Sequence, residues 1–179
     1  HPIRLLLISA SPRAHGNTLY LANRALAVLS SLPFPVESTV YSFADKQFHA
    51  CTGCCICYEN GGQCIWKDDF EALRKLWIAA DCVVYVLPVY VVGIPGQLKC
   101  FFDRLHNAFH GYYPVTSMRH MKPVGAITQG GDFGGGQELA MLDVMRHAAL
   151  INCMYIAPDG SYLGSAGWAD GPSGVELAA

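Results

Sequence analysis

Charged residues are scarce in this chain of 179 residues. Lysine, arginine, aspartate and glutamate together make up 15% of it, the formal net charge is −2, and no run of basic residues occurs. Proteins that bind nucleic acid usually carry a clustered positive surface to meet the phosphates. We therefore expect no nucleic-acid partner. Hydrophobic residues make up 52% of the chain, which favours a globular domain that also buries surface between subunits.

Long hydrophobic segments are missing as well. The longest apolar run, residues 83–92, is interrupted by Pro88 and is much shorter than the roughly 20 residues that cross a bilayer as a helix. The apolar stretch at residues 5–8 is too short for the core of a secretory signal peptide. We expect a soluble, cytoplasmic protein with no membrane partner, and its length suits one domain.

Two common nucleotide-binding motifs are absent from the loop at residues 9–18, SASPRAHGNT. It has neither the G-K-[ST] ending of a P-loop nor G-x-G-x-x-G, which argues against nucleoside triphosphate hydrolysis and against a Rossmann dinucleotide site. The groups that it does contain suit an anion at the start of a helix. They are Ser9, Ser11, Arg13, Asn17 and Thr18. An ordinary polar loop before a capped helix would look similar, so the loop alone leaves both interpretations open.

Short apolar runs alternate with helix-like stretches along the chain. Residues 3–10 and 81–87 are rich in Leu, Ile and Val without alternation, which is typical of strands buried on both faces of a parallel sheet. Weaker strands are expected at residues 36–41, 123–128 and 151–157, and helices at residues 18–32, 69–80, 96–108 and 136–149. Asp68 and Asp69 can cap the second helix, and Pro95 suits the first turn of the third. The pattern predicts an α/β fold with a doubly wound, five-stranded parallel sheet.

Open parallel sheets bind ligands beyond the carboxyl ends of their strands. After the strand at residues 81–87 comes Tyr90, which offers a flat face, followed by Gly93 and Gly96, which permit close approach of the backbone. The strand at residues 123–128 ends in TQGGDFGGGQE, whose glycines can turn N–H groups toward a ring edge. Each loop alone could be ordinary, but three unusual loops at one edge favour a ligand with a phosphate and a planar ring.

Most of the cysteines lie in one segment. Residues 51–64 read CTGCCICYENGGQC, in which Cys51, Cys54, Cys57 and Cys64 are separated by two, two and six residues. Such spacing predicts metal or redox chemistry instead of a disulfide framework, and it allows a loop to hold an iron–sulfur cluster. Zinc also accepts four thiolates, although zinc loops usually use two separated C-x2-C pairs. A metal-free loop stays open, and Cys55 is an extra thiol that could compete as a ligand or be inert.

Other cysteines and histidines carry no clear site. Cys82, Cys100 and Cys153 lie in apolar context and are expected to pack in the core. His106 and His110 are four residues apart on one expected helix face but have no acidic third ligand. We therefore expect them to contact solvent or an interface, and we assign no catalytic acid or base.

Three segments together resemble one protein family in their order and spacing. They are SASPRAHGNT at residues 9–18, LPVYVVGIPGQLKCFFDR at residues 87–104 and KPVGAITQGGDFGGGQE at residues 122–138. These segments resemble the NADPH-dependent FMN reductase family, which has the flavodoxin-like fold, and the resemblance extends over about residues 4–157. It implies that Ser9, Ser11, Arg13, Asn17 and Thr18 hold the FMN phosphate, that Pro88, Val89, Tyr90 and Val91 line the isoalloxazine, and that Gln129, Gly130 and Gly131 meet its polar edge. Trp66, Tyr112 and Tyr113 could border the same pocket.

The cysteine segment resembles the compact cluster motif of the iron–sulfur flavoproteins within that family. The resemblance implies a [4Fe-4S] cluster on Cys51, Cys54, Cys57 and Cys64. It also implies a homodimer or homotetramer in which the cluster and the flavin of neighbouring subunits face each other. We expect residues 1–157 to form the FMN-binding domain, with a cysteine-rich loop at residues 50–67 as an insertion. Residues 158–179 are expected to be a tail, either loop or an arm that docks on a neighbouring subunit.

The expected function is that of a flavin-dependent oxidoreductase that passes electrons between FMN and the cluster. Its partner would be a redox protein such as ferredoxin or a small-molecule acceptor, and the use of NAD(P)H stays open. One alternative is a cluster-free NAD(P)H-dependent FMN or quinone reductase. Another is a non-enzymatic, flavodoxin-like electron carrier. The modest net charge disfavours the carrier, because such proteins tend to be strongly acidic for docking.

Overall fold

A parallel β-sheet forms the centre of the protein in the computed structural model, which describes residues 1–112 and 121–169. Its strands are β1 (Ile3–Ser9), β2 (Val36–Ser42), β3 (Cys82–Pro88), β4 (Pro123–Gly130) and β5 (Met154–Tyr155). They lie in the order β2-β1-β3-β4-β5, and every pairing is parallel. This is the strand order of flavodoxin-like proteins. The predicted fold class is confirmed.

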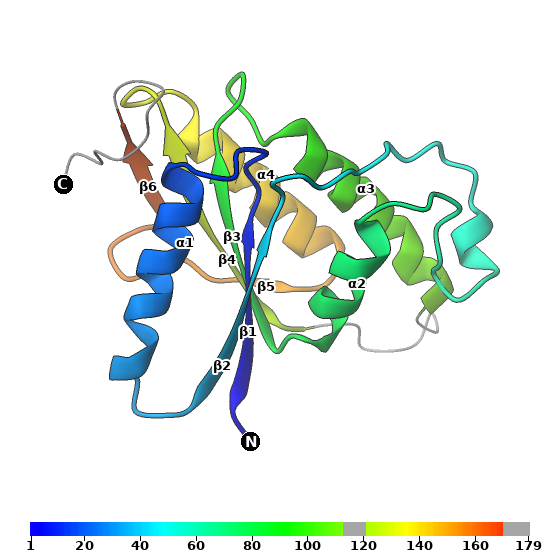
Figure 1. The fold of residues 1–179 in the computed structure, drawn as a ribbon, viewed down its shortest axis with the longest axis horizontal. Coiled ribbons are helices and arrows are strands. Elements are labelled where there is room, and N and C mark those ends of the chain that lie inside the picture. Colours follow the sequence, from blue (N-terminus) through cyan, green and yellow to red (C-terminus); the bar gives the residue numbers. More distant parts are fainter. Residues whose placement is uncertain (113–120, 170–179) are drawn as a thin grey trace.

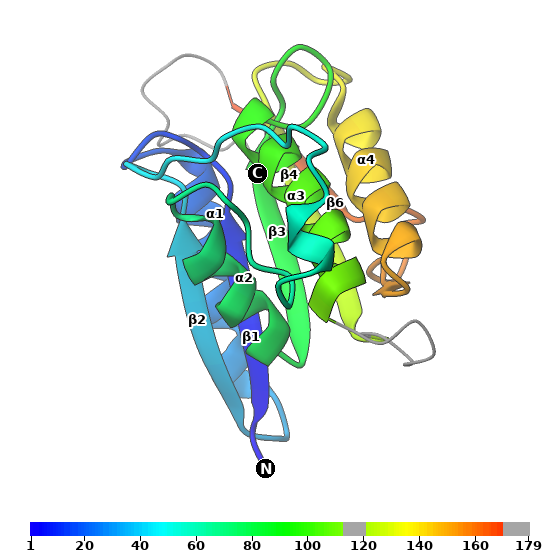
Figure 2. The same cartoon turned by 90° about the vertical axis from the view of Figure 1, so that its right-hand side faces the viewer.

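Helices cover both faces of the sheet, as Figures 1 and 2 show. They are α1 (Asn17–Ala27), α2 (Phe70–Ala79), α3 (Gly96–Tyr112) and α4 (Gln137–Leu150), with short 3-10 turns η1 (Leu29–Ser31) and η2 (Ile56–Tyr58). Helix α1 lies on one face, and α2, α3 and α4 lie on the other. In the described part of the chain, no helix is both long and apolar enough to cross a membrane.

Side-chain alternation along the strands explains this packing. Leu6 and Ile8 belong to the large hydrophobic core under α2, α3 and α4, and Leu7, which is equally buried, points to the face that α1 covers. The aromatic centre of the core is Tyr85 of β3, which is fully buried and whose hydroxyl accepts a 2.8 Å hydrogen bond from Trp77 Nε1. Satisfying that polar group allows two large rings to be buried without loss of hydrogen bonding.

The fifth strand is shorter than expected, and a sixth strand was not predicted. β5 has two residues, which pair with the start of β4, and β6 (Ser165–Trp168) pairs in parallel with residues 127–130 at its end. The expectation of a loop from residue 158 is therefore wrong at residues 165–168. The sequence Ser-Ala-Gly-Trp has little strand propensity, so the free edge of β4 decides its conformation. Residues 170–179 lie outside the described part, and the predicted docking arm stays a prediction there.

Two helix ends differ from the sequence prediction. Helix α1 ends at Ala27 instead of residue 32, and in the turn η1 that follows, the hydroxyls of Ser30 and Ser31 donate to the carbonyls of Ala27 and Val28. Such side-chain bonds compete with the helical ladder. Helix α3 continues through Tyr112, because Phe109 in its last turns is buried against Trp77, with ring centroids 5.4 Å apart. The extra turn matters for the cysteine segment, which packs against it.

Candidate functional site

Three loops meet at the carboxyl edge of the sheet, and together they are called the flavin loops (residues 9–18, 88–96 and 128–138). They follow β1, β3 and β4, which are adjacent in the sheet. Backbone bonds tie the strand ends together: Ala10 N–H donates to Val86 O at 2.8 Å, and Val89 N–H donates to Gln129 O at 2.8 Å. The structure therefore brings the three predicted segments to one place.

The first flavin loop contains buried polar atoms that have no partner. Ser9, Ser11, Asn17 and Thr18 are at most 4% exposed. Within the described residues, Ser9 Oγ and Asn17 Oδ1 are buried and make no hydrogen bond. A buried polar group without a partner costs about 1–3 kcal/mol. Helix α1 begins beside them after Gly16, with no side-chain cap and no acidic residue in its first turn, so its N–H groups and dipole favour an anion here.

The second flavin loop is a tight hairpin under backbone strain. Tyr90 N–H donates to Gly93 O at 3.0 Å, and Gly93 N–H donates back to Tyr90 O at 3.1 Å. The two residues between them, Val91 and Val92, have φ of 48° and 64°. Branched side chains rarely adopt positive φ, and this kind of turn normally uses Asn-Gly. Strain of this kind persists mainly in loops that hold ligands, and the two valines concealed the turn from sequence analysis.

The third flavin loop packs directly on that hairpin. Gly136 has φ of 102°, and a Cβ on it would lie 2.7 Å from Val92 Cα. Gln129 is buried, and its Nε2 donates to Gly130 O at 2.6 Å. Nothing lies within 4 Å of the place where a side chain on Gly131 would begin. The predicted ring-edge residues are thus present, with open space at Gly131.

A cavity of about 620 Å³ adjoins the second and third flavin loops. Its wall includes Val92, Phe133 and Trp168, and the rings of Phe133 and Trp168 meet edge to face with centroids 5.2 Å apart. Phe133 is 82% exposed. Sequence analysis indicated the part of this wall that belongs to the second and third flavin loops, but it missed Trp168, which belongs to β6. Its only sequence signal was a tryptophan within a glycine-rich tail.

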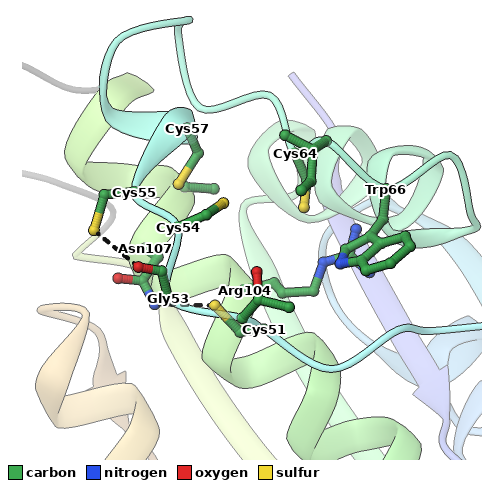
Figure 3. Close-up of a pocket in the computed structure, with 12 residues that line it drawn as sticks. Cys51, Gly53, Cys54, Cys55, Cys57, Cys64, Trp66, Arg104 and Asn107 are labelled. Carbon is green, nitrogen blue, oxygen red and sulfur yellow. Dashed lines mark hydrogen bonds between the residues drawn. The ribbon is translucent and has the colours of Figure 1, made fainter.

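The cysteine loop, residues 50–67, runs between β2 and α2 and lies along α3. It encloses a cavity of about 20 Å³ together with the second half of α3. Figure 3 shows the sulfurs of the four predicted ligands, Cys51, Cys54, Cys57 and Cys64, turned toward a common space. Cys55 points the other way, and its thiol donates to Gly53 O at 3.4 Å. The structure therefore separates the extra thiol from the predicted set.

Backbone contacts with α3 hold the cysteine loop in position. A Cβ on Gly111 would overlap the carbonyl oxygen of Cys57 and lie 2.8 Å from its carbonyl carbon. That oxygen also accepts a 2.9 Å bond from Gly62 N–H. The hydroxyl of Tyr58 donates to Asn107 Oδ1 at 2.9 Å. Only a glycine at position 111 allows the backbone of the cysteine loop to approach α3 this closely.

The thiols lie in different electrostatic environments. Burial, followed by the nearby Cys64 thiolate, raises the pKa of Cys57. The backbone N–H of Ile56 and the Thr52 hydroxyl lower the pKa of Cys54. Among residues 1–112 and 121–169, no three His, Cys, Asp or Glu side chains are close enough to hold a single metal ion. The sulfurs thus surround a space instead of meeting at one point.

The remaining sequence predictions have mixed outcomes. Cys82, Cys100 and Cys153 are half-buried, and Cys100 and Cys153 pack against the core. His106 and His110 lie on one face of α3 with ring centroids 5.0 Å apart. Trp66 lines the cysteine cavity, and its place beside the flavin stays a prediction. Its ring stacks on His49 at 4.4 Å. The side chain of Tyr112 and all of Tyr113 lie outside the described part.

Comparisons with known proteins agree with this architecture. A sequence profile of the NADPH-dependent FMN reductase family matches residues 3–169. An iron–sulfur flavoprotein of Methanocaldococcus jannaschii is 36% identical over 175 residues, which cover 94% of this chain and 84% of the relative. A second from the same organism is 32% identical over 157 residues, covering 88% and 77%. A solved NAD(P)H:quinone oxidoreductase from Methanothermobacter marburgensis has a TM-score of 0.61 at 15% identity, covering 90% of this chain and 88% of that one.

The solved structure is too distant in sequence to support more than the fold. The family profile, in contrast, extends from the first residue of β1 to the residue after β6. One family therefore accounts for all six strands and the loops between them. This protein belongs to the NADPH-dependent FMN reductase family, in its iron–sulfur flavoprotein subgroup, and is a flavin-dependent oxidoreductase.

Proposed function

We propose that this protein transfers electrons between FMN, held by the flavin loops, and an iron–sulfur cluster held by Cys51, Cys54, Cys57 and Cys64. The observation that carries the proposal is the orientation of the cysteines in Figure 3. The four thiols with cluster-like spacing face one space, and the fifth thiol, Cys55, faces away from it. If the cysteines were only inert packing residues, we would not expect four thiols to face one space and the fifth to face away from it.

The residues at the flavin loops fit an FMN phosphate and ring. The unpartnered Ser9 and Asn17 atoms lie at the start of α1, where helix N–H groups favour an anion. Tyr90 and Val91 project from the strained hairpin, and Gly131 leaves room beside them. When bound, FMN supplies the redox chemistry, accepting two electrons and releasing them singly. The protein's own residues would bind the phosphate, position the ring and shield it from water.

The arrangement of the thiols supports a cluster over a single zinc ion. A tetrahedral zinc site has Zn–S bonds of about 2.3 Å, which bring its four sulfurs into near contact. A four-iron cluster is a larger body that holds its thiolates further apart, around a common space such as the one that these sulfurs face. The amide of Asn107 donates to Cys51 Sγ at 3.7 Å. Such N–H···S contacts are typical of iron–sulfur sites.

The two proposed sites lie at different ends of α3. The helix begins at Gly96 beside the flavin loops and reaches Asn107 at the cysteine cavity, about 16 Å further along at 1.5 Å per residue. Cys54 in the cavity wall and Tyr58 elsewhere on the cysteine loop are exposed. We therefore propose a homodimer or homotetramer that joins the cysteine loop of one chain to the flavin loops of another. A ferredoxin or a small molecule would be the external electron partner.

A second candidate function is reduction of a quinone or of free flavin with no cluster. The cavity of about 620 Å³ beside Phe133 and Trp168 favours it, because exposed rings at a cavity wall suit a planar acceptor. NAD(P)H would then be the reductant.

A visible spectrum with iron and acid-labile sulfide assays, on protein purified without oxygen, separates the two functions. We expect flavin bands over a broad absorbance, with about four iron and four sulfide per chain. Cys57→Ser should lose the iron and keep FMN, and its matched control, Cys55→Ser, should keep both. A pure flavin spectrum without iron, together with NAD(P)H-driven quinone turnover, would instead establish the cluster-free reductase.

A further inference from the structure

A buried arginine lies beside the cysteine cavity. Arg104 comes from α3, its side chain is 1% exposed, and it forms part of the cavity wall. Its guanidinium donates two hydrogen bonds to the Asp68 carboxylate, from Nη1 to Oδ2 at 2.6 Å and from Nη2 to Oδ1 at 2.9 Å. It also lies over the ring of Phe70, 4.2 Å from the centroid. Burying a guanidinium is costly unless it is paired, so this pair holds the charge in one place.

Asp68 is itself held in place by donors other than Arg104. Its carboxylate accepts from the backbone N–H of His49 at 2.8 Å and from that of Phe70 at 3.2 Å. Burial raises the pKa of Asp68, but hydrogen bonds from Arg104 and His49 outweigh burial and lower it to about 2. The carboxylate is thus ionised and saturated with donors. The two contacts with Arg104 fix the guanidinium plane relative to the cysteine loop.

Arg104 shares the wall of the cysteine cavity with the four predicted ligands. Within the described chain, Arg104 Nε is buried and makes no hydrogen bond. Cys64 lies in the wall of the same cavity. Burial lowers the pKa of Arg104, but Asp68 and Cys64 outweigh burial and raise it. On the same helix, one turn further, Asn107 Nδ2 donates to Cys51 Sγ at 3.7 Å. One proposed ligand, Cys51, therefore accepts a hydrogen bond from α3, and all four line the cavity beside the Arg104 charge.

We propose that Arg104 and Asn107 are positioning residues for the cysteine site, with Arg104 supplying a fixed positive charge in the wall of the cavity that the four thiols line. This inference rests on the proposed function, since it assumes that the loop binds a metal centre. Four thiolates around one centre concentrate negative charge, and a buried cation beside them offsets part of it. Arg104 should therefore strengthen metal binding and raise the reduction potential of a bound cluster, because reduction adds a further negative charge.

Removing Arg104 alone would not test the idea, because it would leave Asp68 buried and unpaired. The informative variant is the double replacement Arg104→Met with Asp68→Asn, which removes both charges and keeps similar volumes. A matched control is Arg4→Met with Asp81→Asn. That pair has the same two-bonded geometry, at 3.0 Å and 2.7 Å, but is exposed and lies at the start of β1 and β3. Both double variants remove one positive and one negative charge.

The first readout is Cd²⁺ affinity, measured by competition with a chelator on the full FMN-loaded chain in its cluster-free form. Cys57→Ser provides the baseline for other thiols. We expect the Arg104/Asp68 variant to bind Cd²⁺ about 10- to 100-fold more weakly, with unchanged FMN content, while the Arg4/Asp81 variant binds like the wild type. Wild-type affinity in the Arg104/Asp68 variant would overturn the proposal, since Arg104 would then matter only as the partner of Asp68.

A second pair of variants covers the case in which the double variant does not fold. Asn107→Ala removes the donor to Cys51, and Tyr58→Phe removes only the hydroxyl that bonds to Asn107. Asn107→Ala should weaken Cd²⁺ binding several-fold more than Tyr58→Phe does, and equal effects would overturn the assignment of Asn107. Where a cluster can be reconstituted, its potential should be lower in the Arg104/Asp68 variant than in the wild type. If the wild-type protein binds Cd²⁺ but takes up no iron or sulfide, the proposed function is wrong. The comparison of Cd²⁺ affinities would still test the role of Arg104.

Discussion

Gly111 of α3 and Cys57 of the cysteine loop are in contact through their backbones. A Cβ on Gly111 would overlap the Cys57 carbonyl oxygen and lie 2.9 Å from Gly62 N. The cysteine loop thus packs directly against the backbone of the last turn of α3. Its position depends on a residue that lies far from the cysteines in the sequence and has no side chain.

Replacing Gly111 by alanine should therefore displace the cysteine loop. Alanine favours a helix by about 1 kcal/mol over glycine, but overpacking against a backbone costs about 1–3 kcal/mol or more, so the clash outweighs the gain. We expect loss of metal binding with FMN retained, measured as iron per chain and flavin per chain. Gly96→Ala in the first turn of the same helix meets nothing within 4 Å and should leave the iron content unchanged. Equal iron in both variants would contradict the contact.

Gly136→Ala should weaken FMN binding through the hairpin. The added methyl would meet Val92 Cα at 2.7 Å, and the residue has φ of 102°, so the hairpin must move away from the third flavin loop. We expect the dissociation constant for FMN, measured by quenching of flavin fluorescence, to rise at least tenfold. Gly134→Ala has the same kind of strain, with φ of 70°, but no contact within 4 Å. If both variants bind FMN equally well, the contact with Val92 does not position the hairpin.

Val91→Asn should stabilise the protein without FMN. Val91 is fully exposed and has φ of 48°, so its replacement loses no packing and relieves backbone strain that asparagine tolerates better. We expect a gain of about 1 kcal/mol in the free energy of unfolding, read from urea denaturation of the apoprotein. Val28→Asn is the control, since Val28 is also exposed but has φ of −86° and carries no such strain. A gain at Val28 as large as at Val91 would rule out the strain explanation.

His147 should make the protein less stable in acid. Burial, followed by the charges of His106 and Lys99, lowers the pKa of His147 from 6.5 to about 3. The neutral ring, stacked on Phe102 at 3.8 Å, therefore contributes stability that is present above pH 6.5 and lost as the pH falls toward 3. The expected slope reaches about 1.4 kcal/mol per pH unit.

Urea denaturation between pH 7 and pH 4 tests this slope. His147→Phe keeps a flat ring on Phe102 and removes the titration, so its free energy of unfolding should fall less steeply with acid than that of the wild type. Parallel curves for the two proteins would show that His147 does not carry the effect. The FMN content of the variant serves as a check on the fold.

Sequence patterns predicted the features whose physical cause is local. Unbroken apolar runs identified β1 and β3, since strands buried on both faces need no polar alternation. The hydroxyls before α1 and the glycines after β4 indicated ligand loops. The spacing of the cysteines indicated a metal or redox site on one loop, because these cysteines are close together in the chain. The hairpin at residues 90–93 escaped notice, since two valines replace the residues that normally mark such a turn.

The contacts that tertiary structure decided join residues far apart in the chain. Arg104 and Asp68 are adjacent only because α3 packs beside the start of α2, and β6 is a strand only because the edge of β4 offers backbone partners. The sequence by itself determined the first four strands, the three loops and the spacing of four cysteines on one loop, through apolar runs and short-range spacing. Which thiols turn inward, which cation lies behind them and which strand closes the cavity depended on the packing of the whole fold, because hydrogen bonds and ion pairs require three-dimensional proximity that spacing does not encode.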